Sequence, residues 1–141
     1  MSEADDLALR VAQTLLAREG TGPAWGVEIE AAREGYARVR MVVREDMLNG
    51  HRSAHGGMIF AVADTAFAYA CNSRNDTTVA QSATIAFLAP ASAGDALVAE
   101  AREISRSGRS GVYHVSVRTA DGRAIAEFTG LSRTIGGAVI N

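Results

Sequence analysis

An amphipathic helix is predicted at the start of the chain. Apolar residues recur there at a spacing of four, namely Leu7, Val11 and Leu15, which places them on one face of a helix. Ser2 with Asp5 is typical of a helix start, and Gly20 followed by Gly22 and Pro23 predicts its end.

Six later segments show the pattern of β-strands. Two precede the middle of the chain, at residues 27–31 and 36–43, with a turn at Glu34 and Gly35 and with Val39, Met41 and Val43 on one face. Four follow it, at residues 78–88, 96–105, 111–119 and 124–135. The Asp121-Gly122 pair between the last two is a strong hairpin signal. The order of elements is therefore helix, two strands, a middle segment, and four strands.

The middle segment predicts a buried helix. Residues 49–57 form a polar, glycine-containing loop, and residues 58–73, MIFAVADTAFAYACNS, are long and rich in alanine. Near-continuous apolarity indicates burial on most sides. The run is shorter than the about 20 residues of a membrane span and contains a carboxylate. One sheet can bury such a helix only by curling around it, which predicts a single α+β domain over residues 1–141 and favours oligomerisation.

Composition and charge limit the classes of function. The chain has 141 residues, of which 48% are hydrophobic and 21% charged, as expected of an ordered globular domain. A net charge of -2 argues against a surface built to hold nucleic acid. Cys71 is the only cysteine, so no internal disulfide is possible, and the acidic start MSEADDLALR lacks the pattern of a secretory signal. We therefore expect a cytoplasmic protein.

Asp64 is the first candidate for chemistry. It and Thr65 are the only strongly polar side chains between Met58 and Cys71, and burying a carboxylate costs several kcal/mol unless it is compensated. The alternative is a structural carboxylate satisfied by a helix N-terminus or an arginine. Thr65 could orient a water molecule, or could simply bond to the backbone of its own helix.

Gly56 and Gly57 precede the predicted helix and could expose backbone N–H groups at its positive end, as an oxyanion hole requires. The alternative is a loop turn that needs positive φ. Gly56 and Asp64 are eight residues apart, about 12 Å along one helix. One thioester cannot touch both, but two antiparallel helices related by a two-fold axis would bring the glycine of one beside the aspartate of the other. This predicts an acyl-transfer site shared between two subunits.

The sequence gives weaker support for other kinds of catalytic or binding site. His51, His55 and His114 do not form a zinc-ligand pattern, so we expect no metal. Ser110 lacks the G-x-S-x-G spacing of a serine hydrolase. Residues 105–111, SRSGRSG, could hold phosphates through Arg106, Arg109 and the bare amides around Ser107 and Gly108, or could be a solvated hairpin turn.

The stretch NGHRSAHGGMIFAVADTAFAYACNS, residues 49–73, closely resembles the signature of the phenylacetic-acid-degradation thioesterases of the hotdog superfamily. The resemblance continues through SATIAFLAPASAGDALVAEA, SGRSGVYHVSV and SRTIGG. It implies a long helix wrapped by a curved antiparallel sheet, in dimers that pair into tetramers. It also implies hydrolysis of acyl-CoA thioesters, with phenylacetyl-CoA and ring-hydroxylated relatives as the usual substrates and no cofactor.

The same resemblance implies roles for individual residues. Asp64 matches the catalytic acid, and Gly56 matches the donor of the oxyanion amide, with Gly57 beside it. Asn49 and Thr65 match other polar residues of the active site, His55 matches a positioning histidine, and the loop of Arg106 and Arg109 resembles the coenzyme-binding region. Two other functions remain open: an acyl-CoA binding or sensing protein without turnover, and a hotdog enoyl-CoA hydratase that would use Asp64 and His55 together.

Overall fold

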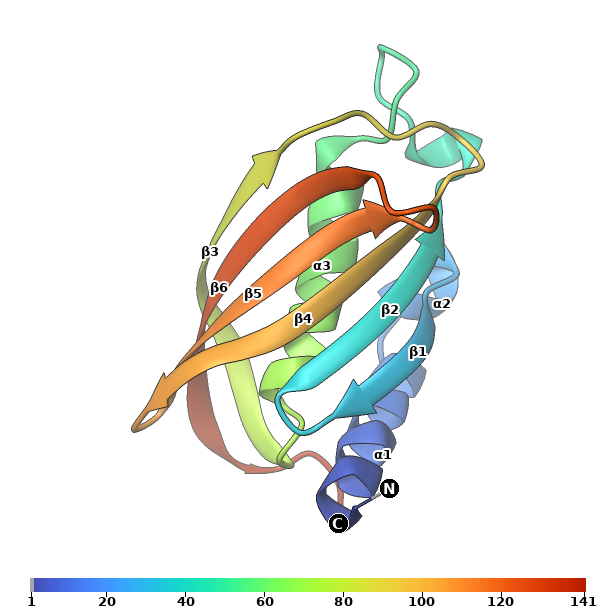
Figure 1. Cartoon of the computed structure of the whole chain (residues 1–141). Helices are drawn as coiled ribbons and strands as arrows, with labels where there is room; N and C mark the ends of the chain where they lie inside the picture. The colour runs from blue at the N-terminus through green and yellow to red at the C-terminus, as the bar shows by residue number, and fades with distance from the viewer. Residues whose placement is uncertain (1) are drawn as a thin grey trace.

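A six-stranded antiparallel sheet wraps around one long helix in a computed structural model that describes residues 2–141 (Figure 1). The elements in chain order are α1 Glu3–Arg18, α2 Thr21–Trp25, β1 Glu28–Arg33, β2 Tyr36–Val42, a 3-10 helix Glu45–Met47, α3 Gly56–Cys71, β3 Asp76–Phe87, β4 Ala96–Ser107, β5 Ser110–Thr119 and β6 Ala124–Ala138. The predicted order of helix, two strands, central helix and four strands is thus confirmed.

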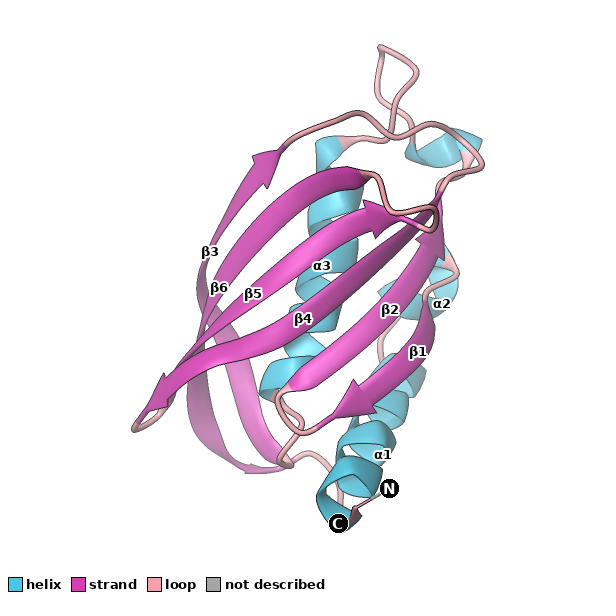
Figure 2. Ribbon diagram, in the orientation of Figure 1, coloured by secondary structure: helices cyan, strands magenta, loops and turns pink. Residues whose placement is uncertain are grey.

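The strands lie in the order β1-β2-β4-β5-β6-β3, and every neighbouring pair is antiparallel. Helix α3 connects β2 to β3, so the chain crosses behind the sheet before β3 adds at its far edge (Figure 2). The α3 helix therefore packs against the inner face of the sheet. The two ends of the chain lie together, beyond the C-terminal end of α3 (Figure 1).

The core lies between α3 and the inner face of the sheet. Val39, Met41 and Val43 are at most 2% exposed, as their alternation predicted. The ring of Phe67 on α3 packs directly on Gly130 of β6, where an added Cβ would lie only 2.8 Å from the ring. Glycine at this position therefore allows the helix to approach the sheet.

Helix α1 packs beside β1 and α3 and is capped as predicted, with the Ser2 hydroxyl accepting a hydrogen bond from the Asp5 N–H at 3.1 Å. The hydroxyl of Tyr69 on α3 donates to Glu19, just after α1. The sequence prediction missed α2, because Gly20, Gly22 and Pro23 suggested only a stop. Proline is compatible with the first turn of a helix, which explains this short turn.

Helix α3 is buried on most sides, as the sequence predicted, and leaves one stripe partly exposed in the single chain. The residues of this stripe are Ala61, Asp64, Thr65 and Ala68. None of the helices in residues 2–141 combines the length and apolarity needed to cross a membrane.

Candidate active site

Helix α3 begins two residues earlier than predicted, so Gly56 and Gly57 lie in its first turn rather than in the preceding loop. The reason is a side-chain cap: Nδ1 of His55 accepts a hydrogen bond from the Gly57 N–H at 2.8 Å. Neither glycine has a positive φ. Within the described chain, the N–H of Gly56 has no acceptor. One amide without an acceptor therefore lies at the positive end of the helix dipole.

The loop before α3 is organised by Asn49. Its Oδ1 accepts hydrogen bonds from the His51 N–H at 2.9 Å, the Ser53 N–H at 3.2 Å and the Ser53 hydroxyl at 3.3 Å. Leu48 and Ala54 form an antiparallel bridge that closes the loop. Since Oδ1 is occupied, the Nδ2 group of Asn49 is the part of the amide left to donate to a ligand.

A pocket of about 340 Å³ opens beside the free amide of Gly56. Its walls present polar as well as apolar surface, and they comprise Asn49, Ser53, Ala54, Gly56, Ile59, Phe87, Leu88, Ala89 and Pro90. Phe87 and Leu88 are 53% and 58% exposed in the single chain. Sequence reasoning missed this wall, because an apolar end of a strand followed by proline is common in any sheet protein. The volume and lining suit a small acyl group.

Asp64 lies in the middle of α3, on its partly exposed stripe and away from this pocket. No hydrogen bond or ion pair of its carboxylate occurs in residues 2–141, so neither an arginine nor a helix end of the same chain satisfies it. Burial raises the pKa of Asp64 above the usual aspartate value. An unpaired carboxylate with a raised pKa is typical of a catalytic acid or base.

The neighbours of Asp64 on α3 are less reactive. The Thr65 hydroxyl donates to the carbonyl of Ala61 at 2.8 Å, which is the bond within its own helix. Its oxygen can still accept a hydrogen bond from a water molecule. Burial, with the nearby Asp64 carboxylate second, raises the pKa of Cys71 to about 12, so this residue stays a neutral thiol.

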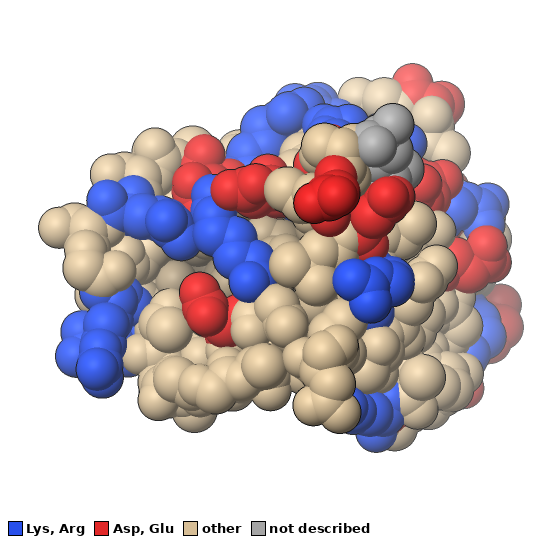
Figure 3. All heavy atoms as spheres, turned by 90° about the horizontal axis from the view of Figure 1, so that it is seen from below, with Lys and Arg blue, Asp and Glu red and all other residues tan. Residues whose placement is uncertain are grey.

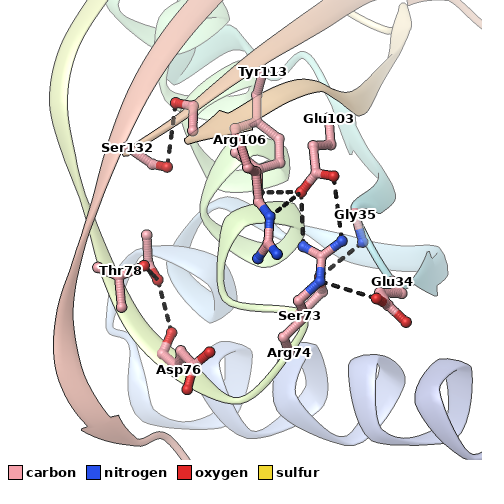
Figure 4. A network of polar contacts seen from close by, with 12 residues as sticks. Glu34, Gly35, Ser73, Arg74, Asp76, Thr78, Glu103, Arg106, Tyr113 and Ser132 are labelled. Carbon is pink, nitrogen blue, oxygen red and sulfur yellow. Dashed lines mark hydrogen bonds and ion pairs between the residues drawn. The ribbon is translucent and has the colours of Figure 1, made fainter. Parts of the chain in front are cut away.

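The β4–β5 hairpin carries the predicted coenzyme loop at the other end of α3. Arg106, Gly108 and Arg109 line a small polar cavity that Cys71 also lines. Nε of Arg106 lies 3.6 Å from Glu103, and Glu103 also accepts from Arg74 and from the Tyr113 hydroxyl (Figure 4). Basic side chains gather at this projecting end, on the left in Figure 3. Ser107 lies at the exposed end of β4.

The candidate groups are therefore spread along α3 in a single chain. Gly56 and Asn49 lie at its first turn, Asp64 lies eight residues on, and the hairpin lies beside Cys71 at its last turn. At 1.5 Å per residue the first and last turns are about 22 Å apart. Across residues 2–141 there is no cluster of three or more histidine, cysteine or acidic side chains that could hold a metal ion.

Comparison with known proteins identifies relatives over most of this chain. Residues 51–126 match the model of the family described as "Thioesterase superfamily". The acyl-coenzyme A thioesterase PaaI of Escherichia coli K12 is 42% identical over 128 residues, which cover 91% of each chain.

Solved structures agree with this similarity. The E. coli PaaI protein from the phenylacetic acid degradation operon superposes with a TM-score of 0.94 at 40% identity, covering 96% of this chain and 99% of that one. A mutant of the phenylacetic acid degradation protein PaaI from Thermus thermophilus superposes with a TM-score of 0.80 at 36% identity. That alignment covers 83% of this chain and 100% of the other.

Proposed function

This chain belongs to the thioesterase superfamily, has its hotdog fold and is an acyl-CoA thioester hydrolase, and we propose that it hydrolyses phenylacetyl-CoA or its ring-hydroxylated relatives. The free N–H of Gly56 beside a pocket of about 340 Å³, one wall of which is formed by Phe87 and Leu88, is the observation that supports this most directly. The similarity to PaaI proteins supports the aromatic acyl group.

We propose that the working unit is a homodimer formed through β3 and the exposed stripe of α3. Strand β3 is a sheet edge of 12 residues whose only charged residue is Asp76, and Val79 on it is 44% exposed. The opposite edge, β1, is short and carries Glu28, Glu30 and Arg33. Edges are normally protected by such charges. The unprotected edge of β3 therefore favours pairing with a second copy.

Antiparallel pairing of β3 with its own copy about a two-fold axis would also place the two α3 helices antiparallel. The Asp64 of one subunit would then lie beside the Gly56 of the other, and each hairpin with Arg106 and Arg109 would approach the other subunit's pocket. This arrangement accounts for a carboxylate that has no partner in its own chain. It also unites groups that one chain keeps about 22 Å apart. We further propose that two such dimers pair into a tetramer.

In the proposed reaction the Gly56 N–H donates a hydrogen bond to the thioester carbonyl oxygen. As a general base, Asp64 takes a proton from water while the water oxygen bonds to the carbonyl carbon; as a nucleophile, it bonds to that carbon itself. Either attack gives an oxyanion that the Gly56 amide stabilises. Collapse breaks the carbon–sulfur bond and releases CoA, whose thiolate takes up a proton. In the nucleophilic form, water then cleaves the acyl-aspartyl anhydride.

Release of free thiol from a panel of acyl-CoA substrates tests this proposal. We expect release with phenylacetyl-CoA and its hydroxylated relatives to exceed that with acetyl-CoA or long-chain acyl-CoA. Tight binding of all substrates without thiol release would instead indicate a binding or sensing protein. A hydroxyacyl-CoA product would indicate a hydratase. In a single turnover in oxygen-18 water, label in the Asp64 carboxylate would show the nucleophilic route with water attacking the aspartyl carbonyl, because the general-base route places the label only in the released acid.

A further inference from the structure

The imidazole of His55 lies directly over Gly57. Its Nδ1 accepts the Gly57 N–H at 2.8 Å, and a Cβ added to Gly57 would lie 3.0 Å from Nδ1 and 3.3 Å from Cε1. The backbone of His55 is fixed as well, since its N–H donates to the Met47 carbonyl at 2.8 Å. Gly57 thus allows the ring to come close enough to cap the helix.

Because of this cap, the N–H groups of the two glycines differ in their hydrogen bonding. The Gly57 N–H is occupied by His55, whereas the Gly56 N–H is left free beside the pocket. A neutral imidazole that accepts at Nδ1 carries its proton on Nε2, so it offers one lone pair and no negative charge. The usual capping residues are serine, threonine, aspartate and asparagine. Histidine at this position therefore needs a specific reason.

The reason lies in the charge that develops at the neighbouring amide. An aspartate at position 55 would cap the helix equally well, but would place a negative charge next to a developing oxyanion. Such a charge opposes the stabilisation that the Gly56 amide and the helix dipole provide. A neutral cap has no such effect.

We propose that His55 is a positioning residue, whose neutral Nδ1 engages the Gly57 N–H so that the Gly56 N–H alone is presented to the substrate carbonyl. This inference rests on the proposed role of Gly56 as the oxyanion donor. It assigns His55 to the helix rather than to the substrate, and it explains why two consecutive glycines precede the apolar part of α3.

Three substitutions separate this role from a purely structural one. His55→Ala removes the cap, and we expect a lower Tm and a loss of kcat of tenfold or more. His55→Asn restores a neutral cap and should recover most of that kcat. His55→Asp restores an equally good or better cap, so its Tm should match or exceed that of His55→Asn. Its kcat should nevertheless remain at least tenfold below that of His55→Asn, with KM little changed.

Two outcomes would overturn the inference. Equal kcat in His55→Asn and His55→Asp would show that charge at the cap does not matter. Failure of His55→Asn to recover kcat, despite a recovered Tm, would show that the imidazole itself contacts the substrate. Nitrogen-15 NMR of the wild-type ring gives an independent readout, in which we expect Nδ1 without a proton; the opposite tautomer contradicts the cap.

Failure of the proposed function can be told apart from failure of this inference. If Gly56→Pro, which lacks the amide proton, kept the wild-type rate, Gly56 would not be the oxyanion donor and both proposals would fail. If Gly56→Pro is inactive while His55→Asn and His55→Asp are equally active, only the role of His55 is rejected.

Discussion

The ring of Phe87 packs against Gly56 so closely that a Cβ added to the glycine would lie 3.2 Å from Cζ of Phe87. The end of strand β3 thus touches the first turn of α3 at the amide that we propose as the oxyanion donor. Because the ring is 53% exposed in the single chain, its outer side remains available to a ligand.

Gly56→Pro and Gly56→Ala form a matched pair that tests the amide itself. Both add a Cβ against Phe87, but only proline removes the N–H. Proline is favoured at the first position of a helix, and the extended backbone of His55, with φ -60° and ψ 136°, suits a following proline. We expect Gly56→Pro to lower kcat about 10²–10³-fold relative to Gly56→Ala. Equal rates in folded variants would argue against the amide as donor.

Mixing two inactive chains tests whether the site is shared. In a heterodimer of Gly56→Pro and Asp64→Asn, one site would contain the intact Gly56 of one chain and the intact Asp64 of the other. Random exchange should therefore recover about one quarter of the wild-type rate. Thiol release after refolding the mixture measures this, with each variant alone as the control. No recovery in verified heterodimers would place the whole site in one chain.

Asp64→Asn should separate stability from activity. Since burial raises the pKa of Asp64 in the folded chain, the folded state favours the neutral acid, and the charged form costs stability above the ordinary aspartate pKa. The stability contributed by the neutral acid is fully present below the ordinary aspartate pKa and is lost as the pH rises through the raised pKa of the folded chain. At neutral pH we expect the kcat of Asp64→Asn to be about 10²–10⁴-fold lower than that of the wild type. We expect its Tm to be higher than that of the wild type.

The difference in Tm between Asp64→Asn and the wild type should close as the pH falls below the raised pKa. Thermal unfolding at several pH values measures this, and size-exclusion chromatography with light scattering checks that the oligomer is intact. A variant that is less stable than the wild type at neutral pH would show that the carboxylate is paired in the assembled protein. The wild-type rate should also fall as the pH decreases through the raised pKa of Asp64, at a pH above the usual aspartate pKa.

Thr84→Lys tests the β3 edge as the dimer interface. Thr84 lies on β3 opposite Thr129 of β6, and both are exposed in the single chain. Lysine on a free edge blocks strand pairing, so we expect Thr84→Lys to weaken the dimer at least about tenfold and to lower activity with it. Thr129→Lys places the same charge one strand inward and is the control. Light scattering would contradict the proposed interface if both variants remained equally dimeric.

Phe87→Leu tests the aromatic wall of the pocket. Leucine keeps an apolar side chain but removes the ring face, and aromatic pairs contribute about 0.5–1.5 kcal/mol beyond their buried area. We therefore expect kcat/KM for phenylacetyl-CoA to fall about two- to tenfold, with acetyl-CoA hydrolysis as the internal control. An equal effect on both substrates would assign Phe87 to packing against Gly56 alone.

Arg106→Ala with Arg109→Ala tests the hairpin as the site for the CoA phosphates. Nε of Arg106 faces Glu103 at 3.6 Å, which leaves its terminal nitrogens to bind phosphate. We expect KM for phenylacetyl-CoA to rise about tenfold at constant kcat, and no change with phenylacetyl-pantetheine, which lacks these phosphates. Arg123→Ala, in the β5–β6 hairpin and paired with Asp95, is the control. A similar rise in KM for both substrates would contradict this role.

Local sequence patterns were sufficient to predict the order of elements and the identity of the central helix. Alternation placed Val39 and Met41 in the core, and the alanine-rich run predicted α3, because side-chain periodicity depends only on neighbours along the chain. Asp64 could also be identified as a candidate from the sequence, because a single charged residue within an apolar run is a local pattern as well. The start of α3 was misplaced by two residues, since a histidine cap is not a usual helix signal.

Only the tertiary structure decided which groups come together. It brought Phe87 and Leu88 of β3 to Gly56, closed the Gly57 amide with His55, and left Asp64 unpaired on α3. It also placed the Arg106 hairpin beside Cys71, at the opposite end of α3 from Gly56. Most of these relationships join residues far apart in sequence, so they depend on strand order and helix direction, which periodicity along the chain does not encode.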